Sequence, residues 1–287
     1  MSQLPPFPDR EAESHKGDFG RALLVGGSRG MTGAIALSGM AALRGGAGLV
    51  TLATPESVLD VVASFDPCYM TVPLPEYDDR PGQICAPART KIQSLADQAT
   101  CVAYGPGIGR SEGLDLLVAW LYEHLPQPLV IDADGLNGLA NRPEGLRKPG
   151  GLRLIPTHPG EFRRLVGAED FERKAAEEKS KQLAHEHGIV IVLKGHHTFV
   201  TDGKQSYHNS TGNPGLATGG TGDVLTGIIT ALVCQGLAPF AAAQLGVYLH
   251  GLAGDLAAEE LGQAGMIASD LIQFLPDAIA KSQPISS

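Results

Sequence analysis

The residues best suited to carry chemistry lie between Asn209 and Gly227, in the segment NSTGNPGLATGGTGDVLTG. Gly219, Gly220 and Gly222 allow positive φ angles and close approach of the backbone to a ligand. Apolar residues at helical spacing follow, so the glycines lead into the N-terminus of a buried helix. Free N–H groups at a helix N-terminus bind anions. The segment therefore predicts an anion site with Asp223 beside it.

Asp223 has two interpretations. Asp is a favoured helix N-cap, and taken alone the residue is equally well explained by that role. A cap, however, requires neither the three nearby glycines nor the NSTGN segment before them. A phosphoryl-transfer site requires backbone donors for the phosphoryl oxygens and a base for the attacking hydroxyl. Both are present here, which favours Asp223 as a catalytic base.

Short apolar strands alternate with helical patterns along the rest of the chain. Strands are predicted at 22–25, 49–53, 101–104 and 189–193 and directly before Asp132, with helices at 32–43, 114–125, 170–187 and 240–261. The uninterrupted apolar run at 189–193 is typical of a strand buried on both faces of a parallel sheet. A hairpin is predicted between 199–201 and 206–208. We expect one α/β domain over residues 1–287, with a mostly parallel central sheet and helices on both faces.

Polar residues and glycines follow several predicted strands, where parallel sheets bind ligands. Gly107 and its neighbouring glycines form either a ligand loop or a tight turn. Asp132 and Asp134 could hold a metal through water or cap the next helix, and the sequence favours neither. Lys194 ends a buried strand, where its charge is costly unless it meets an anion. A nucleotide phosphate would supply that anion.

Histidines mark three further places. His158 and Glu161 flank a Pro-Gly turn; no third zinc ligand is nearby, so a substrate-contacting histidine and a glutamate that orders magnesium-bound water are favoured. The pair His196 and His197 is more typical of a turn than of a metal site, and remains a candidate for nucleotide contact. His250 lies within an apolar helical pattern and is interpreted as structural.

Composition excludes several classes of protein. The chain has 287 residues, 43% of them hydrophobic, and no apolar run long enough for a membrane span or a signal segment, so we expect a soluble cytoplasmic protein without a membrane partner. Four widely spaced cysteines indicate neither a zinc site nor a disulfide framework. The net charge of −9 argues against a nucleic-acid partner.

The GGTGD segment resembles that of the ribokinase-like superfamily, and an ordered series of motifs resembles the ADP/ATP-dependent NAD(P)H-hydrate dehydratase family. In chain order these are HKG at 15–17, GA at 33–34, GAGLV at 46–50, GPG at 105–107, DAD at 132–134, HPGE at 158–161, VLKG at 192–195 and NSTGNPGLATGGTGD at 209–223. Each motif is weak alone, but their order across nearly the whole chain is specific. Two small departures, PTHPGE for TPHPGE and DADGLN for DADALN, leave Asp223 untouched.

The resemblance implies a fold and a set of site residues. The fold is a ribokinase-like three-layer sandwich. Contacts to the hydrated dinucleotide would come from Ala34, Gly107, His158 and Asp223. Nucleotide contacts would come from Lys194, Gly195, His196, His197, Thr198 and Gly222. The anion hole would comprise Gly219, Gly220, Thr221 and Gly222, and Glu161 would hold magnesium through water.

The resemblance also implies an activity, that of a hydro-lyase which repairs the hydrated forms of NADH and NADPH (NADHX and NADPHX). With Asp223 as base, the substrate hydroxyl would be phosphorylated and phosphate eliminated, giving NAD(P)H, AMP and phosphate. The implied donor is ADP, with ATP as the alternative, and Mg²⁺ is the implied cofactor. A stand-alone dehydratase that forms a homotetramer is expected.

Two other functions remain open. The first is an ATP-dependent kinase of the same fold that acts on a thiazole, pyrimidine or pyridoxal alcohol. The second is a non-catalytic dinucleotide-binding protein, against which Asp223 argues, because binding alone does not require an acid beside phosphates. Residues 66–89, rich in proline, are assigned no function.

Overall fold

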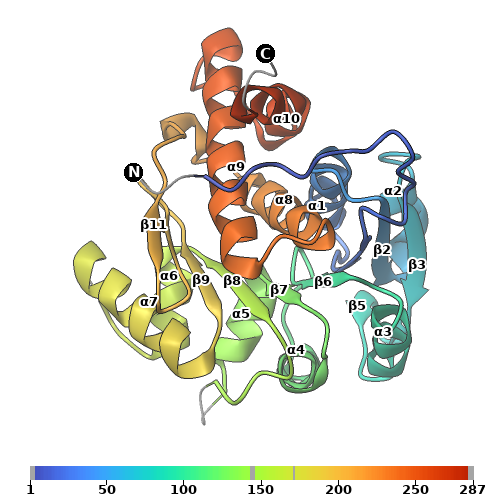
Figure 1. Ribbon diagram of the computed structural model, residues 1–287. Helices are drawn as coiled ribbons and strands as arrows, with labels where there is room; N and C mark the ends of the chain where they lie inside the picture. Colours follow the sequence, from blue (N-terminus) through green and yellow to red (C-terminus); the bar gives the residue numbers. More distant parts are fainter. Residues whose placement is uncertain (1–3, 143–145, 171, 284–287) are drawn as a thin grey trace.

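A nine-stranded sheet forms the centre of the molecule (Figure 1). The computed structural model describes residues 4–142, 146–170 and 172–283. Across the sheet the strands are β11 (Ser206–His208), β10 (Phe199–Thr201), β9 (Val190–Leu193), β8 (Arg153–Thr157), β7 (Leu129–Ile131), β6 (Cys101–Tyr104), β1 (Arg21–Val25), β2 (Leu49–Pro55) and β3 (Met70–Leu74). Strands β9 to β3 run parallel, whereas β10 and β11 form an antiparallel hairpin at one edge.

The pattern of side chains explains why these segments form a central sheet. All four residues of β9 and of β6 are buried, as expected for strands covered on both faces. The predicted parallel sheet and the predicted hairpin across 202–203 are therefore confirmed. The long helix predicted from residue 170 begins at Arg173 instead.

Helices cover both faces of the sheet, which gives three layers. One face carries α1 (Thr32–Arg44), α2 (Leu59–Ala63), α8 (Thr221–Cys234), α9 (Pro239–Leu261) and α10 (Ala268–Ser282). The other carries α3 (Ala88–Ala96), α4 (Glu112–His124), α5 (Ala133–Ala140), α6 (Pro159–Val166) and α7 (Arg173–His187). Figure 1 shows α8, α9 and α10 gathered together on the first face. No helix within the described ranges is long and apolar enough to cross a membrane.

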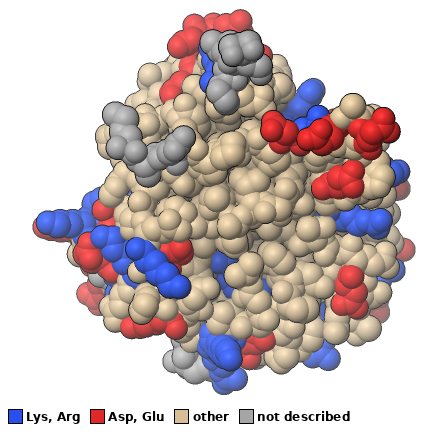
Figure 2. Space-filling model, viewed as in Figure 1, with Lys and Arg blue, Asp and Glu red and all other residues tan. Residues whose placement is uncertain are grey.

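The helix α8 is the most deeply buried element next to the site. Every residue of it is buried except Gly222 and Asp223 in its first turn. It packs closely on α1, because a Cβ at Gly227 would lie only 2.2 Å from the Ser38 carbonyl oxygen. Figure 2 shows that charged side chains gather at the rim of this side and leave a broad uncharged area over the helices at its centre. The close approach at Gly227 therefore anchors α8 against α1.

Residues 66–89, which the sequence left without a role, build β3 and a small hairpin of β4 (Glu76–Tyr77) and β5 (Arg80–Ile84). The hairpin touches two loops at the carboxyl edge of the sheet. Arg29 N donates to Gly82 O at 3.3 Å, and Gln83 Nε2 donates to Arg110 O at 3.2 Å. It therefore supports the loops after β1 and β6.

Candidate active site

The loops after β1 and β6 meet where the strand order reverses. The chain leaves β1 toward β2 on one side and leaves the neighbouring strand β6 toward β7 on the other, and open α/β sheets bind ligands at such a point. Gly27 N donates to Pro106 O at 2.8 Å, joining the two loops. Gly107 has φ of +61°, and a Cβ there would lie 2.9 Å from the Cβ of Ala34. The structure thus brings the predicted substrate residues Ala34 and Gly107 into contact.

The N-terminus of α8 has unpaired amides, as an anion site requires. Gly220 is the N-cap residue with φ of +92°, a conformation that favours glycine. Within the described part of the chain, no hydrogen bond engages the N–H groups of Gly219, Gly220, Thr221 or Gly222. The four predicted anion-hole residues therefore present free donors at a helix N-terminus.

Asp223 does not cap the helix, so that interpretation is wrong. It is the third residue of α8, and its side chain has no hydrogen-bond partner among the described residues. Burial and the charge of Asp132 raise the pKa of Asp223 to about 7, although Lys194 opposes the shift. The backbone carbonyl of Asp223 accepts a hydrogen bond from Ser38 Oγ at 2.8 Å. Ser38 lies on α1, one helical turn after Ala34. A free carboxylate with this pKa is suited to general-base catalysis near neutral pH.

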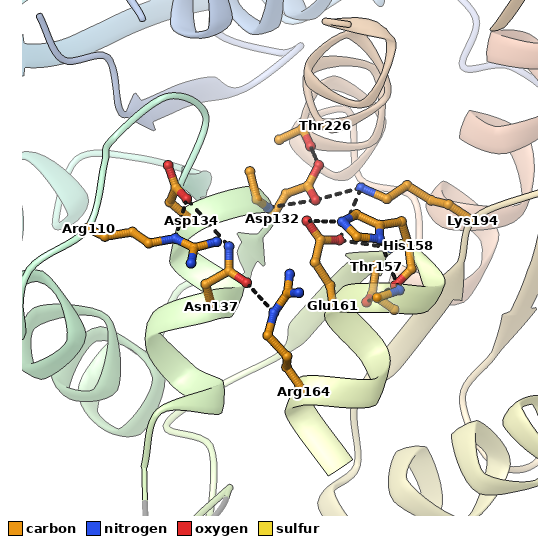
Figure 3. Close-up of polar contacts among 12 residues, drawn as sticks. Arg110, Asp132, Asp134, Asn137, Thr157, His158, Glu161, Arg164, Lys194 and Thr226 are labelled. Carbon is orange, nitrogen blue, oxygen red and sulfur yellow. Dashed lines mark hydrogen bonds and ion pairs between the residues drawn. The ribbon is translucent and has the colours of Figure 1, made fainter. Parts of the chain in front are cut away.

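Lys194 meets an anion, but it is a carboxylate of the protein. Its Nζ lies 2.8 Å from Asp132 Oδ1 and 3.7 Å from Glu161 Oε2, as Figure 3 shows. Asp132 also accepts from Thr226 Oγ1 at 2.6 Å. Burial opposes the charge of Lys194, but the two carboxylates prevail and raise its pKa. A phosphate contact for Lys194 stays a prediction, since the expected anion is already supplied by Asp132.

Asp132 and Asp134 stabilise local structure rather than forming a pair. Asp132 caps α5 by accepting from Ala133 N at 2.8 Å. Asp134 accepts from Gly109 N and Arg110 Nε, each at 3.2 Å, and so holds the loop after β6. Of the two interpretations left open, the capping role is therefore confirmed for Asp132. Within the described ranges, no group of three His, Cys, Asp or Glu side chains is placed to hold a metal ion.

His158 and Glu161 close the N-terminus of α6. His158 Nδ1 accepts from Gly160 N at 3.0 Å, while Glu161 Oε2 accepts from His158 N at 2.8 Å. Burial and Lys194 lower the pKa of His158, and burial raises the pKa of Glu161. The imidazole of His158 is half exposed, and its Nε2 lies 3.3 Å from Glu161 Oε1. The pair therefore places a neutral histidine beside the cluster of Asp132, Lys194 and Glu161 (Figure 3).

A cavity of about 550 Å³ adjoins the first turn of α8. It is lined by all six predicted nucleotide residues, namely Lys194, Gly195, His196, His197, Thr198 and Gly222. The opposite wall is the segment 209–217 together with α9. His197 has φ of +53° and its backbone carbonyl accepts from Arg173, so the turn is held in an unusual conformation. The cavity therefore reaches Gly222, the residue directly before Asp223.

Sequence reasoning missed one residue of the site and one pairing within it. His250, interpreted as structural, lines the cavity. The pairing of Asp132 with Lys194 was missed, although both follow strands separated by β8 alone. The HKG motif lies away from the site: a Cβ at Gly48, just before β2, would collide with Lys16 O, which places the motif at the amino edge.

Comparisons with known proteins agree with this geometry. The family model described as NAD(P)H-hydrate dehydratase matches residues 22–277. The ADP/ATP-dependent NAD(P)H-hydrate dehydratase from Bacillus subtilis, co-crystallised with ATP and Mg²⁺, is 31% identical with a TM-score of 0.81, covering 99% of this chain and 100% of that one. The chain belongs to the NAD(P)H-hydrate dehydratase family. The predicted family membership is therefore confirmed.

Two further relatives show how much of a longer family protein this chain covers and which fold it shares. The bifunctional NAD(P)H-hydrate repair enzyme of Moorella thermoacetica is 45% identical over 274 residues, which cover 94% of this chain and 51% of that protein. The chain thus spans about half the length of the curated relatives it matches. A ribokinase-like superfamily protein from Enterococcus faecalis is 28% identical with a TM-score of 0.81 and covers 96% of this chain and 92% of that one. The predicted ribokinase-like α/β fold is confirmed.

Proposed function

We propose that the chain is an NAD(P)H-hydrate dehydratase, a hydro-lyase that uses ADP to restore hydrated NADH and NADPH. The observation that carries the proposal is the pairing, in one helical turn, of a free carboxylate with pKa of about 7 and unpaired backbone amides. The family membership of the chain points to the same activity. The alternative of an alcohol kinase is not favoured by the family match.

Different residues serve the different steps of the proposed reaction. We place the hydrated ring near Ala34, Gly107 and His158, with its hydroxyl facing Asp223. Asp223 removes the hydroxyl proton as the oxygen attacks the β-phosphorus of ADP, and AMP leaves. The amides from Gly219 to Gly222 stabilise the charge on the transferred group. The lone pair of the ring nitrogen then expels phosphate, and loss of a ring proton completes the double bond.

The nucleotide is proposed to occupy the 550 Å³ cavity, where Lys194 to Thr198 form one wall. The turn of Gly195 to Thr198 would face the nucleotide, and Lys194 would bring a positive charge near its phosphates. Mg²⁺, when bound with the nucleotide, would neutralise phosphate oxygens. Glu161 is the carboxylate that we propose to reach such an ion through water, since its own oxygens already accept from His158. We also propose a cytoplasmic homotetramer of single-domain chains.

The decisive experiment supplies NADPHX, Mg²⁺ and either ADP or ATP and follows the recovery of reduced-nicotinamide absorbance. We expect recovery with release of one AMP and one phosphate per NADPH formed from ADP. A reaction without nucleotide is the control. Absence of recovery with both nucleotides would reject the proposal, and a stable phosphorylated product without recovery would indicate a kinase.

The pH dependence follows from Asp223. Since the base must be ionised and burial raises its pKa to about 7, kcat/KM should rise about tenfold per pH unit below 7 and level off above it. Burial and the charge of Lys194 lower the pKa of His158, which moves the protonation of that ring toward more acid pH. Initial rates from pH 5.5 to 8.5 at subsaturating NADPHX measure the profile, with circular dichroism as the control for folding. A flat profile would exclude Asp223 as the titrating base.

A further inference from the structure

The cavity contains a polar side chain that the proposed chemistry leaves unused, that of His250 on α9. Its Nε2 lies 2.9 Å from the backbone carbonyl oxygen of Thr221. A carbonyl oxygen only accepts hydrogen bonds, so Nε2 carries the proton. Burial lowers the pKa of His250 to about 4, which keeps the ring neutral at physiological pH. The second nitrogen, Nδ1, is therefore an acceptor.

Among the described residues, no hydrogen bond reaches that acceptor, and the ring is held through Nε2 alone. Three other polar side chains on the same wall are occupied. Asn209 Nδ2 donates to Val247 O at 3.0 Å, Thr211 Oγ1 to Tyr248 O at 2.8 Å, and Asn213 Nδ2 to Gly254 O at 2.9 Å. These bonds fix the segment 209–216 against α9 before any ligand binds. His250, which lines the cavity, thus keeps Nδ1 as a preformed acceptor.

The chemistry of Nδ1 restricts what it can contact. A lone pair repels phosphate oxygens, so the partner must be a donor on the base or the ribose. Leu216, Leu225 and Val247 line the same cavity and give it apolar walls suited to a planar base. At position 6 adenine has an amino donor, whereas guanine and hypoxanthine carry an oxygen there and have their donors at N1 and, in guanine, the 2-amino group, so discrimination requires the acceptor to face position 6. An acceptor in that position therefore discriminates between them.

We propose that His250 selects adenine nucleotides by accepting, at Nδ1, a hydrogen bond from the 6-amino group of the base. This inference rests on the proposed use of the cavity for ADP. It gives His250 a role in specificity rather than in catalysis. The bond from Nε2 to Thr221 O fixes the ring, so the acceptor keeps its position when the cavity is empty.

The test compares the affinities for ADP and for purine riboside 5′-diphosphate, which lacks only the 6-amino group. Titration calorimetry on the wild type and on His250→Gln gives four dissociation constants. We expect the wild type to favour ADP about tenfold, the value of one net hydrogen bond. Gln can still donate to Thr221 O through its amide nitrogen but offers no acceptor at the Nδ1 position. The ratio should fall to about one in His250→Gln.

Val247→Ala is the matched control, since Val247 lines the cavity one turn before His250 without a polar side chain. It should weaken both ligands alike and keep the tenfold ratio. A wild-type ratio near one would overturn the proposal without reference to any variant. If the wild type binds 2′-deoxy-ADP more weakly than ADP and His250→Gln removes this difference, the bond comes from the ribose, and the proposal is overturned. If neither nucleotide binds the wild type, the proposed function fails, which separates the two results.

Discussion

Asp223→Asn should lower kcat for NADPHX repair by about 10² to 10⁴-fold, the range that general-base catalysis contributes. Asn matches the shape of Asp223 but cannot take the hydroxyl proton, so the loss falls on the chemical step. The affinity for ADP should change little, because the amides that would hold its phosphates belong to the backbone. Single-turnover kinetics and calorimetry with ADP measure the two effects.

The same variant should gain stability at alkaline pH, which separates catalysis from support of the helix. The folded state raises the carboxyl pKa from its ordinary value of 3.8 to about 7. The folded state therefore binds this proton more tightly than the unfolded state, and the associated stabilisation is lost as the pH rises through 7. Asn carries no charge and escapes that loss. Urea unfolding at pH 6 and pH 8.5 should show the larger relative gain at pH 8.5; a uniform decrease would instead indicate a structural role.

Arg153→Met should lower the free energy of unfolding by about 3–5 kcal/mol, the cost of breaking a buried charged network. Arg153 begins β8 and is only 1% exposed. Its guanidinium donates hydrogen bonds to five backbone carbonyls. Four of them lie at or just after the end of α4, and the fifth belongs to the residue directly before Arg153; they are those of Leu121, Tyr122, Leu125, Gln127 and Leu152. These carbonyls would lose their donor in the variant.

The contacts of Arg153 have an electrostatic reason. The carbonyls at the C-terminus of a helix carry partial negative charge, and a guanidinium satisfies several of them at once. Burial lowers the pKa of Arg153 to about 10, so the group stays charged at neutral pH. Urea denaturation measures the loss, with Arg80→Met as the control on an exposed arginine, for which we expect less than about 0.5 kcal/mol. A change below about 1 kcal/mol for Arg153→Met would show that the carbonyls find other partners.

Local patterns were enough to predict the sheet, because β6 and β9 are continuous apolar runs whose length and flanking glycines leave few alternatives. The family resemblance pointed to residues 194–198 as nucleotide contacts; these contiguous residues lie together on the cavity, and their contact with a nucleotide stays a prediction. The partner of Lys194 was not predicted, because Asp132 is 62 residues away and only the strand order brings the two together. His250 was missed for a similar reason: helical spacing identifies the buried side of α9, but not which part of it faces a cavity.

The proposed anion site at the start of α8 consists of main-chain amides, and this affects how it would respond to mutation. No side chain supplies these donors, so replacing the neighbouring side chains by alanine would leave in place the amides that we expect to stabilise the transferred group. Gly219 has open space around its missing Cβ and should accept alanine, whereas Gly220, at φ of +92°, should not. Genetic drift can therefore change the side chains around this turn freely while the ability to hold phosphate persists, as long as the backbone keeps its path.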